Sequence, residues 1–522
     1  MKIIKIFSLL IILSAHFLFG QSEIDREKGL IYLQSNLEVL ASDLFEGRET
    51  ATRGEQLAAL FISKELTKYG VKPFGDDETY FQFFDIMVRK VEPETQLTII
   101  NNDGSLKVLK LGDDFYFSKK LMPSDKYNGN ESNIVFAGYG ITAENYNYDD
   151  YNGIDVKGKI VLLQSGAPEI GEVGFSLEDE KRFGDSNYKI ENAKVHGVVG
   201  ALLIPSARLL RVWGFLKKRS VSPSISLINT GEADKETIPL ALLSEESVKD
   251  LLSYEKYSYD EILEASENNK PISGFDLTKK IIFNYKTNSE IKEARNVIGI
   301  IEGTDEQLKN EYVVLTAHYD HEGIIGGEIY NGADDNGSGT VAILEAGRRL
   351  ALLKDNKRSI LIVFHAGEEK GLLGSKYLTE NSDFMRGVVS NINIDMVGRE
   401  DTESIYSIGS GKLSAELYEL VERTNSETVK FELDYTFDDP NDPNRYYYRS
   451  DHYNYAKLNI PIVFFYDHMI EDYHKPTDDV EKINFEKIEK VSTLITELAL
   501  RIANLDHKLK LDKKIEETML TD

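Results

Sequence analysis

The segment YVVLTAHYDH, residues 312–321, is a short apolar run that ends in two histidines and an aspartate. Three later segments have the same character: SILIVFHAGEE at 359–369, VVSNINID at 388–395 and PIVFFYDH at 461–468. Stretches with helical spacing, such as 340–353 and 414–424, lie between them, so the pattern predicts buried strands that alternate with amphipathic helices. This alternation indicates an α/β fold with a mixed, mostly parallel sheet and helices on both faces.

Acidic or imidazole side chains follow each of the predicted strands. They are His318, Asp320, His321, Glu368, Glu369, Asp395, His468 and, a little further on, His474. A Gly-rich turn, GADDNGSG at 332–339, adds Asp334 and Asp335 just before a predicted helix. An aspartate at a helix start usually serves as a cap. Open α/β sheets bind ligands beyond the carboxyl ends of their strands, so the joint placement indicates one binding site.

These side chains offer nitrogen and oxygen donors, and the chain contains no cysteine. Two histidines with several carboxylates form a donor set that suits Zn²⁺, Mn²⁺ or Co²⁺. The carboxylates are too many for one ion, whereas a carboxylate shared between two ions about 3.5–4 Å apart would use them all. The sequence therefore predicts a two-metal centre.

Composition excludes several classes of function. The 522 residues include 61 Lys and Arg against 88 Asp and Glu, which gives a net charge of −27. Such a chain repels phosphate backbones and anionic lipids, so nucleic acid is not expected as a partner. The absence of cysteine excludes disulfides, thiolate metal sites and thiol catalysis. The length predicts two or three domains.

The first residues have the pattern of a secretory signal peptide. Lys2 and Lys5 precede an apolar run, 6–19, that is too short for a membrane span of about 20 residues. We expect a signal peptide at 1–20, cleaved near Gly20; an uncleaved anchor is the alternative. No later segment reaches 18 apolar residues, so the mature chain should not insert stably into a membrane. An exported chain without disulfides fits a bacterial periplasmic or secreted protein.

A separate β-rich module interrupts the main domain. Its strand-like runs include NIVFAGYGI at 133–141, VKGKIVLLQSG at 156–166 and VHGVVGALLIP at 195–205. Gly and Asp/Asn turns separate these runs, as in a domain of short strands. We place the module at 119–270, inserted between two parts of the main domain at 21–118 and 271–522.

Five motifs carry a resemblance to a known family. They are TAHYDH at 316–321, YNGADDNGSG at 330–339, FHAGEEKGLLGS at 364–375, NINIDMVG at 391–398 and DYHKPTDD at 472–479. In order and spacing they resemble the secreted co-catalytic dizinc aminopeptidases, a family that also contains glutamate carboxypeptidase, glutaminyl cyclase and the transferrin receptor ectodomain. LASDLFEGRET at 40–50 resembles the start of their catalytic domain, and the module resembles a protease-associated domain. The resemblance implies a zinc exopeptidase fold over nearly the whole mature chain.

The resemblance also implies roles for individual residues. His318 and Asp395 would hold one Zn²⁺, and His474 and Glu369 the other, with Mn²⁺ or Co²⁺ as possible substitutes. Asp335 would bridge the two ions. The remaining two roles in these motifs go to Glu368, as the general base that takes a proton from the water between the ions, and to Asp334, as a support of the turn.

Two further roles follow less directly from the family pattern. Asp320 matches a carboxylate that orients the imidazole of His318. A tyrosine before a Ser-Asp-His segment donates to the developing oxyanion in the family. In RYYYRSDH, residues 445–452, the candidates are Tyr446, Tyr447 and Tyr448, and the spacing to Ser450 favours Tyr447. His321 and His468 match none of the family's ligands.

These observations predict an exported, zinc-dependent aminopeptidase that acts on peptides. A carboxypeptidase of the same fold is an alternative, because Arg399, Arg445 and Arg449 lie near the motifs. A glutaminyl cyclase-like transferase would use one zinc and fewer ligands. A non-enzymatic receptor-like ectodomain would have lost ligands that are all present here. No pattern in the sequence indicates an oligomeric state.

Overall fold

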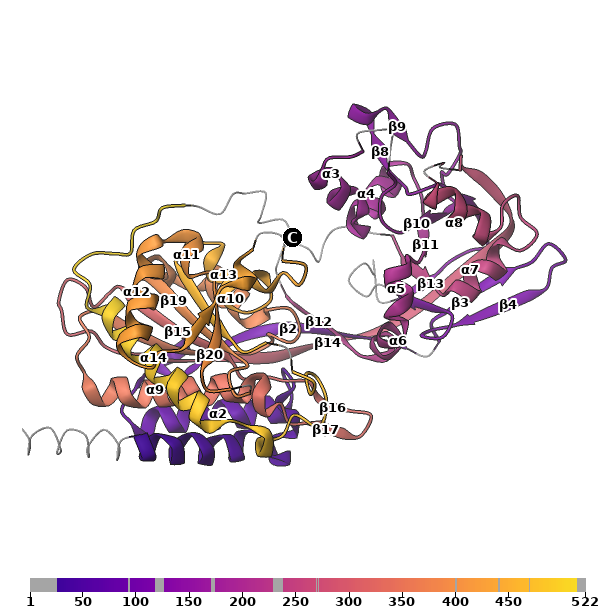
Figure 1. The fold of residues 1–522 in the computed structure, drawn as a ribbon. Helices are drawn as coiled ribbons and strands as arrows, with labels where there is room; N and C mark the ends of the chain where they lie inside the picture. The colour runs from indigo at the N-terminus through magenta and orange to yellow at the C-terminus, as the bar shows by residue number, and fades with distance from the viewer. Residues whose placement is uncertain are drawn as a thin grey trace, which may run out of the picture. The chain divides into compact units, whose positions relative to one another are not determined.

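The computed structural model describes residues 26–513 apart from 93, 118–125, 170–173, 229–237, 269, 271, 400, 440–441 and 469. The predicted signal peptide, 1–20, lies outside the described residues. Two compact units make up the chain: one holds the residues up to Asp85 together with those from Lys292 onward, and the other is Ile86–Ile291 (Figure 1). In the part of the chain that the structure describes, no helix has the length and apolar character needed to cross a membrane.

The first unit is built on a mixed sheet in the order β1–β14–β18–β15–β19–β22–β20–β21. The strands are β1 (Lys72–Pro73), β14 (Phe275–Ile301), β15 (Tyr312–His318), β18 (Ser359–His365), β19 (Val388–Asp395), β20 (Ser404–Ile408), β21 (Glu432–Asp434) and β22 (Ile462–Tyr466). The central strands β18, β15, β19 and β22 are parallel. On one side the last part of β14 pairs antiparallel with β18, and on the other side β20 pairs antiparallel with β22. The expected mixed, mostly parallel sheet is confirmed.

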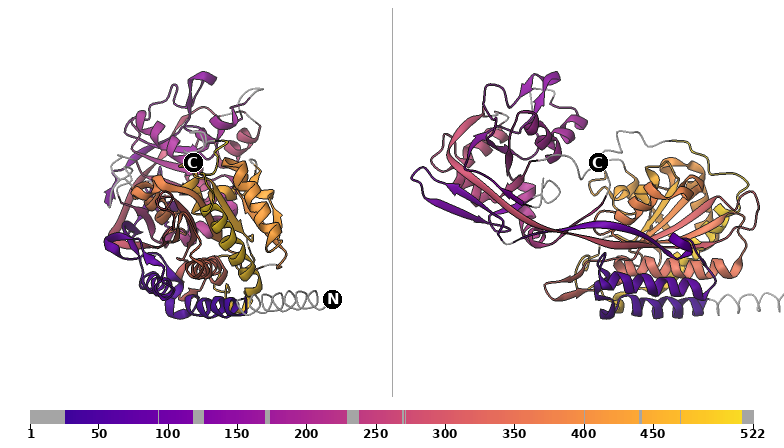
Figure 2. Two further views of the ribbon diagram at one scale, coloured as in Figure 1. Left: turned by 90° about the vertical axis from the view of Figure 1, so that its left-hand side faces the viewer. Right: turned by 180° about the vertical axis from the view of Figure 1, so that it is seen from behind.

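Helices cover both faces of this sheet, as Figure 1 and Figure 2 show. One layer contains α2 (Arg53–Lys68), α9 (Gly339–Leu353), α12 (Ala415–Glu427) and α14 (Phe485–Ala503). The other contains α10 (Leu373–Asn381), α11 (Ser410–Leu413) and α13 (His452–Ala456). Every residue of β18 and β19 is buried, as expected of strands covered by helices on both faces, and in β19 these residues include the polar Ser390, Asn391 and Asn393.

The second unit has a sheet of its own in the order β4–β3–β14–β7–β10–β11–β13–β5. Its strands are β3 (Gln96–Ile100), β4 (Leu106–Lys110), β5 (Phe115–Phe117), β7 (Ser132–Phe136), β10 (Ile160–Gln164), β11 (Gly200–Ile204) and β13 (Leu240–Leu243), with the first part of β14. Helices α4 (Ser186–Val195), α7 (Glu245–Leu252) and α8 (Tyr259–Glu267) add buried side chains to this unit.

The second unit extends beyond the expected 119–270 at both ends. Before that range, β3 and β4 form a hairpin whose first strand pairs with Lys280–Asn284 of β14. Earlier still, β2 (Phe81–Val91) pairs through its last part with β12 (Ser224–Leu227). These ladders join the flanking strands to the module, so its boundary falls within β2 and β14, where the sequence shows no composition change.

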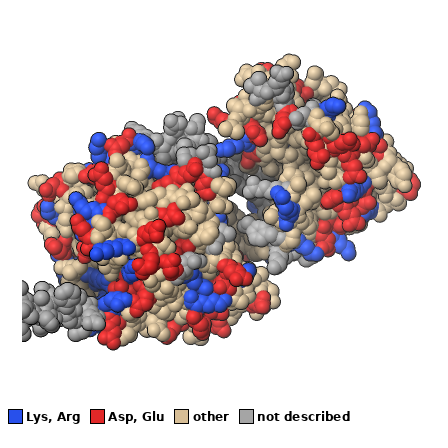
Figure 3. All heavy atoms as spheres, in the orientation of Figure 1, with Lys and Arg blue, Asp and Glu red and all other residues tan. Residues whose placement is uncertain are grey.

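Acidic and basic side chains are intermixed on the surface. Figure 3 shows acidic groups across the visible face of each unit, with basic groups among them. The negative charge of the chain is therefore spread over this face and not gathered in one patch.

Candidate metal centre

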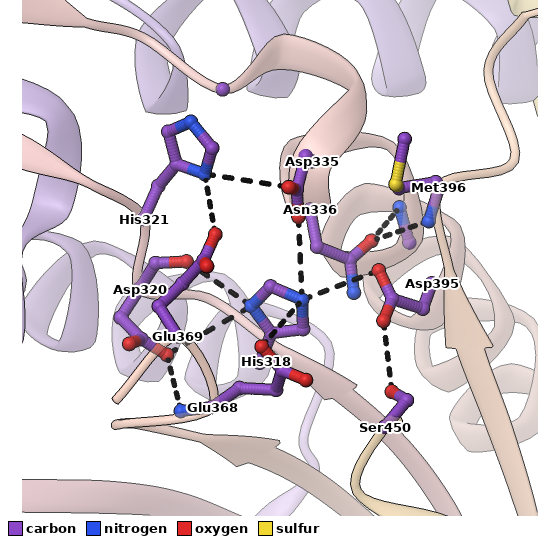
Figure 4. Close-up of polar contacts among 12 residues, drawn as sticks. His318, Asp320, His321, Asp335, Asn336, Glu368, Glu369, Asp395, Met396 and Ser450 are labelled. Carbon is purple, nitrogen blue, oxygen red and sulfur yellow. Dashed lines mark hydrogen bonds and ion pairs between the residues drawn. The ribbon is translucent and has the colours of Figure 1, made fainter. Parts of the chain in front are cut away.

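The carboxyl ends of two neighbouring strands carry two of the residues of the site. His318 is the last residue of β15 and Asp395 the last of β19, and these strands are parallel and adjacent. Their side chains therefore leave the same edge of the sheet, where Nε2 of His318 lies 3.2 Å from Oδ1 of Asp395 (Figure 4). Glu368 and Glu369 follow β18, the other neighbour of β15. Parallel pairing thus gathers three of the predicted motifs at one edge.

A tight turn delivers Asp335 to the same place. Ala333–Ser338 form a short turn of helix ahead of α9, and Gly332 before it has a φ of 55°. A Cβ at Gly332 would lie 2.2 Å from the carbonyl oxygen of Asp335, so only glycine fits. The carboxylate of Asp478 accepts hydrogen bonds at 3.0 Å from the backbone N–H groups of Asp334 and Asp335. Asp334 accepts one from the backbone N–H of Gly398 at 2.7 Å, which agrees with a supporting role.

The five expected donors form two groups that share Asp335. In the first, Nε2 of His318 lies 3.5 Å from Oδ1 of Asp335 and 3.2 Å from Asp395. In the second, Nε2 of His474 lies 3.2 Å from Oδ2 of Asp335 and 3.0 Å from Oε2 of Glu369. The two oxygens of Asp335 thus face different histidines, as a bridging carboxylate requires.

The donor set fits Zn²⁺. Ligands about 2.0–2.1 Å from a tetrahedral ion lie roughly 3.3–3.4 Å from each other, close to the separations within both groups. Nδ1 of His318 is 3.1 Å from the carbonyl oxygen of Asp320, which can only accept, so Nδ1 carries a proton and Nε2 faces the carboxylates. Nε2 of His474 and Oδ2 of Asp335 are buried and make no hydrogen bond among the described residues. Both atoms lie as two ligands of one cation would.

The charges of the cluster shift its pKa values in opposite directions. Burial raises the pKa of Glu369, but the charges of His474 and His321 outweigh it and hold the pKa well below its usual range. Burial lowers the pKa of His474, but the charges of Glu369 and Asp335 raise it to about 11. Glu369 therefore stays ionised, ready to bind a cation.

Glu368 has the opposite behaviour. Burial, followed by the charges of Asp395 and Glu369, raises its pKa well above the usual range, although His318 acts against the shift. Its Oε2 is 3.9 Å from Nε2 of His318, which is too long for a hydrogen bond. A carboxyl group with a raised pKa beside a cation site can accept and return a proton, since added positive charge lowers that pKa again.

Asp320 acts differently from the expectation. Its backbone carbonyl, and not its carboxylate, accepts the hydrogen bond from His318, because the carboxylate is 3.9 Å away. The carboxylate instead accepts hydrogen bonds from Thr50 Oγ1 at 2.7 Å and from the backbone N–H of Glu368 at 3.2 Å. Asp320 therefore joins the loops that carry His318 and Glu368.

The lining of the cavity beside the cluster favours Tyr446 over the expected Tyr447. A cavity of about 40 Å³ adjoins the cluster, and its lining includes Tyr446, Tyr466 and Tyr473 but not Tyr447. Tyr446–Tyr448 form a single 3₁₀ turn, in which successive side chains point about 120° apart. Only one of three consecutive tyrosines can face the cavity, and the turn gives that position to Tyr446. The ring of Tyr447 packs on His452 and Tyr453 instead.

The three arginines near the motifs occupy different positions. Arg399 pairs with Asp478 at 2.7 Å and with Asp472 at 3.4 Å. Through Asp478 it supports the turn that carries Asp335. Arg445 lies over the ring of Tyr448. Arg449 is exposed, lines the cavity and lies 5.2 Å from the ring centre of Tyr446.

Sequence reasoning missed several residues of the site. His321 donates from Nδ1 to Oε1 of Glu369 at 2.8 Å, and Ser450 donates to Oδ2 of Asp395 at 2.8 Å. Arg48 is fully buried and donates to backbone carbonyls around the Asp335 turn. The signals available were the three-residue spacing from His318 to His321 and the conspicuous Arg in the early motif at 40–50, neither of which specifies a partner.

Comparisons with known protein families find a match within each of the two units. Residues 296–499 match the model of peptidase family M28, and residues 127–251 match the model of the PA domain. Leucine aminopeptidase 2 of Trichophyton equinum is 26% identical over 312 residues, 59% of this chain and 50% of that protein. Aminopeptidase YwaD of Bacillus subtilis is 30% identical over 242 residues, 44% of this chain and 49% of that protein. The chain spans about half the length of these curated relatives.

Solved structures share the fold. An aminopeptidase from Aneurinibacillus sp. strain AM-1 superposes with a TM-score of 0.58 at 18% identity, over 93% of this chain and 96% of that one. BSAP, a zinc aminopeptidase from Bacillus subtilis, gives a TM-score of 0.50 at 19% identity, over 94% and 97%. At this identity the similarity concerns the fold alone.

Proposed function

Because residues 296–499 belong to peptidase family M28 and residues 127–251 form a PA domain, we propose that the chain is an exported, zinc-dependent aminopeptidase. Its substrates would be peptides, from which it removes N-terminal residues. The observation that carries the proposal is the shared carboxylate of Asp335, whose two oxygens face His318 and His474 at 3.5 and 3.2 Å, with Glu368 beside them.

Five side chains would hold two Zn²⁺ ions: His318 and Asp395, His474 and Glu369, and Asp335 between them. When bound, the ions would supply Lewis acidity, which lowers the pKa of water and polarises a peptide carbonyl. Mn²⁺ or Co²⁺ could take their place in the same donor set.

The chain's own groups would move the proton. Glu368 lines the cavity, and it would accept a proton from the attacking water and return it to the leaving amine. Tyr446 lines the same cavity and would donate a hydrogen bond to the oxygen that gains charge. Asp320 would keep the loop of Glu368 in place through the hydrogen bond to its backbone N–H.

Two lines of support favour an aminopeptidase within the family. The relatives quoted above carry that name, in fungi and in Bacillus subtilis. Of the three arginines, Arg399 is already paired with Asp478, which removes it from substrate recognition. Arg449 lines the cavity, so a carboxypeptidase that binds a terminal carboxylate there is the second candidate.

Residues 1–20 would be removed as the chain is exported. The mass of the N-terminal peptide, measured on protein recovered outside the cytoplasm, tests this part of the proposal. A chain that begins just after Gly20 supports it, whereas a chain that retains Met1 contradicts it.

The activity is tested with aminoacyl-anilides and N-blocked peptides, each with and without a chelator. We expect cleavage of substrates with a free amine, its loss on chelation and its return with Zn²⁺. Cleavage of N-blocked peptides alone would favour the carboxypeptidase. Full activity after complete removal of metal would overturn the zinc-dependent mechanism.

A further inference from the structure

His321 lies beside the second donor group, and no family motif assigns it a role. Its side chain is fully buried, and Figure 4 shows it directed at Glu369 and Asp335. Nδ1 of His321 is 2.8 Å from Oε1 of Glu369. A carboxylate can only accept, so the imidazole donates this hydrogen bond.

Glu369 is therefore held at both of its oxygens. His321 contacts Oε1, while Oε2 lies 3.0 Å from Nε2 of His474. The rings of His321 and His474 are nearly perpendicular, at 77°, with centres 5.7 Å apart, so the carboxylate is bracketed by two imidazoles. The donation from His321 leaves only Oε2 for a cation beside His474.

The ring of His321 is fixed in place by close packing. A Cβ on Gly332 would lie 2.5 Å from the ring, so the absence of a side chain there makes room for it. The backbone N–H of His321 donates to the carbonyl oxygen of Arg48 at 3.3 Å. Its Nε2 is buried and makes no hydrogen bond among the described residues, so the ring is oriented through Nδ1, which is hydrogen-bonded to Glu369 at 2.8 Å and lies 3.8 Å from Oδ2 of Asp335.

Distance separates a hydrogen-bond donor from a metal ligand. Two ligands of one tetrahedral Zn²⁺ lie about 3.3–3.4 Å apart, whereas a charge-assisted N–H···O bond is about 2.7–2.9 Å long. The separation of 2.8 Å between His321 and Glu369 is that of the hydrogen bond. The separation of His474 from Asp335, at 3.2 Å, is closer to the ligand range, and its separation from Glu369, at 3.0 Å, lies between the two ranges.

We propose that His321 is a positioning residue for the second metal ion, which donates from Nδ1 to Oε1 of Glu369 so that Glu369 binds the ion through Oε2 alone. The donation also favours the ionised carboxylate, which a cation requires. This inference rests on the proposed two-metal centre and adds to it a residue outside the five ligands.

Two substitutions separate positioning from ligation. In His321→Asn, the side-chain amide places an N–H donor near the position of Nδ1 but offers a poor zinc ligand. In His321→Phe, the ring volume is kept and both nitrogens are lost. His507→Phe is the matched control, because His507 is an exposed histidine whose partner is Glu416, away from the cluster.

The measurement is zinc bound per mature full-length chain, determined by elemental analysis across a series of buffered free Zn²⁺ concentrations. We expect His321→Phe to weaken the second ion by about 10–100-fold and His321→Asn to stay within about threefold of the wild type. The absorption spectrum of the Co²⁺-loaded protein should change for His321→Phe and not for His321→Asn. The control variant should behave as the wild type in both measurements.

Two outcomes would overturn the inference. If His321→Phe binds the second ion as tightly as the wild type, the hydrogen bond does not position Glu369. If His321→Asn loses the second ion, His321 is itself a ligand; this comparison stands even if the phenylalanine variant fails to fold. A wild-type chain that binds fewer than two ions refutes the two-metal centre instead, so the two failures are distinguishable.

Discussion

The guanidinium of Arg48 donates a hydrogen bond to the carbonyl oxygen of Gly332 at 2.9 Å, although 284 residues separate them. It also donates to the carbonyl oxygens of Asn331, Tyr319 and Leu40 at 2.6, 2.8 and 2.9 Å. The side chain is completely buried, and burial lowers its pKa to about 10, so it stays charged at neutral pH. Arg48 thereby ties the N-terminal segment to the loops that follow His318 and precede Asp335.

Replacing Arg48 should destabilise the first unit and its metal centre together. In Arg48→Met four buried carbonyls lose their donor, at about 1–3 kcal/mol for each group left unpaired, so we expect a loss of at least ~3 kcal/mol. Urea unfolding followed by circular dichroism measures it. Arg53→Met is the control, because Arg53 is exposed and its pair with Glu46 is worth roughly 0.2–1 kcal/mol. Equal effects of the two substitutions would contradict the role of Arg48.

The adjacent glutamates should separate catalysis from metal binding. Glu368→Gln should keep two metal ions per chain and lose most of its turnover, because an amide cannot take up a proton. Glu369→Gln should lose one ion, because an amide oxygen binds zinc weakly. Metal analysis and initial rates, measured on the same samples, test both expectations. Loss of an ion from Glu368→Gln would show that the two roles are exchanged.

The tyrosine turn offers a second matched pair. If Tyr446 donates to the developing oxyanion, Tyr446→Phe should lower kcat roughly 10²-fold with little change in KM. Tyr447→Phe should stay within about threefold of the wild type, because the Tyr447 hydroxyl has no hydrogen-bond partner among the described residues. Steady-state kinetics on one aminoacyl-anilide decides between them. A larger loss of kcat in Tyr447→Phe than in Tyr446→Phe would instead assign this role to Tyr447, as the spacing to Ser450 predicts.

Glu55 should make the stability of the first unit depend on pH. Burial raises its pKa to about 7, although Arg295 and the hydroxyl of Tyr319 act against the shift. The folded state therefore holds the proton more tightly than the unfolded state between pH 4.5 and 7, so stability is greatest at the acidic end of this window and falls as pH rises. At 1.36 kcal/mol per pKa unit, the fall is about 3 kcal/mol.

Glu55→Gln should remove this pH-dependent part of the stability, because the amide oxygen still accepts from Tyr319 but does not titrate. Urea midpoints at pH 5, 6 and 7, with chelator in every sample, measure the difference between variant and wild type. Glu46→Gln is the control, because Glu46 is only partly buried and pairs with the exposed Arg53. Parallel pH profiles for Glu55→Gln and the wild type would refute the prediction.

Local pattern was sufficient for the sheet and for much of the site. The apolar runs ending at His318 and Asp395 predict strands, and parallel strands bring their carboxyl ends to one edge whatever their order. The pattern therefore places candidate donors at one edge, and the resemblance to a known family selects the five ligands among them. Residue spacing does not say which way a 3₁₀ turn faces, so it could not choose between Tyr446 and Tyr447. Asp320 has its carboxylate on the backbone N–H of Glu368, a contact that depends on the register of two separate loops.

The sequence by itself determined the elements and the chemistry of this protein: the strand and helix periods, the acidic charge, the cysteine-free donor set and the motifs of a two-metal centre. These are local properties, written in residue type and spacing. Only the tertiary structure decided which side chains support that centre. Arg48 with Gly332 and His321 with Glu369 are contacts between distant segments, and such contacts depend on how the packed layers exclude water and on which buried polar groups are left to pair.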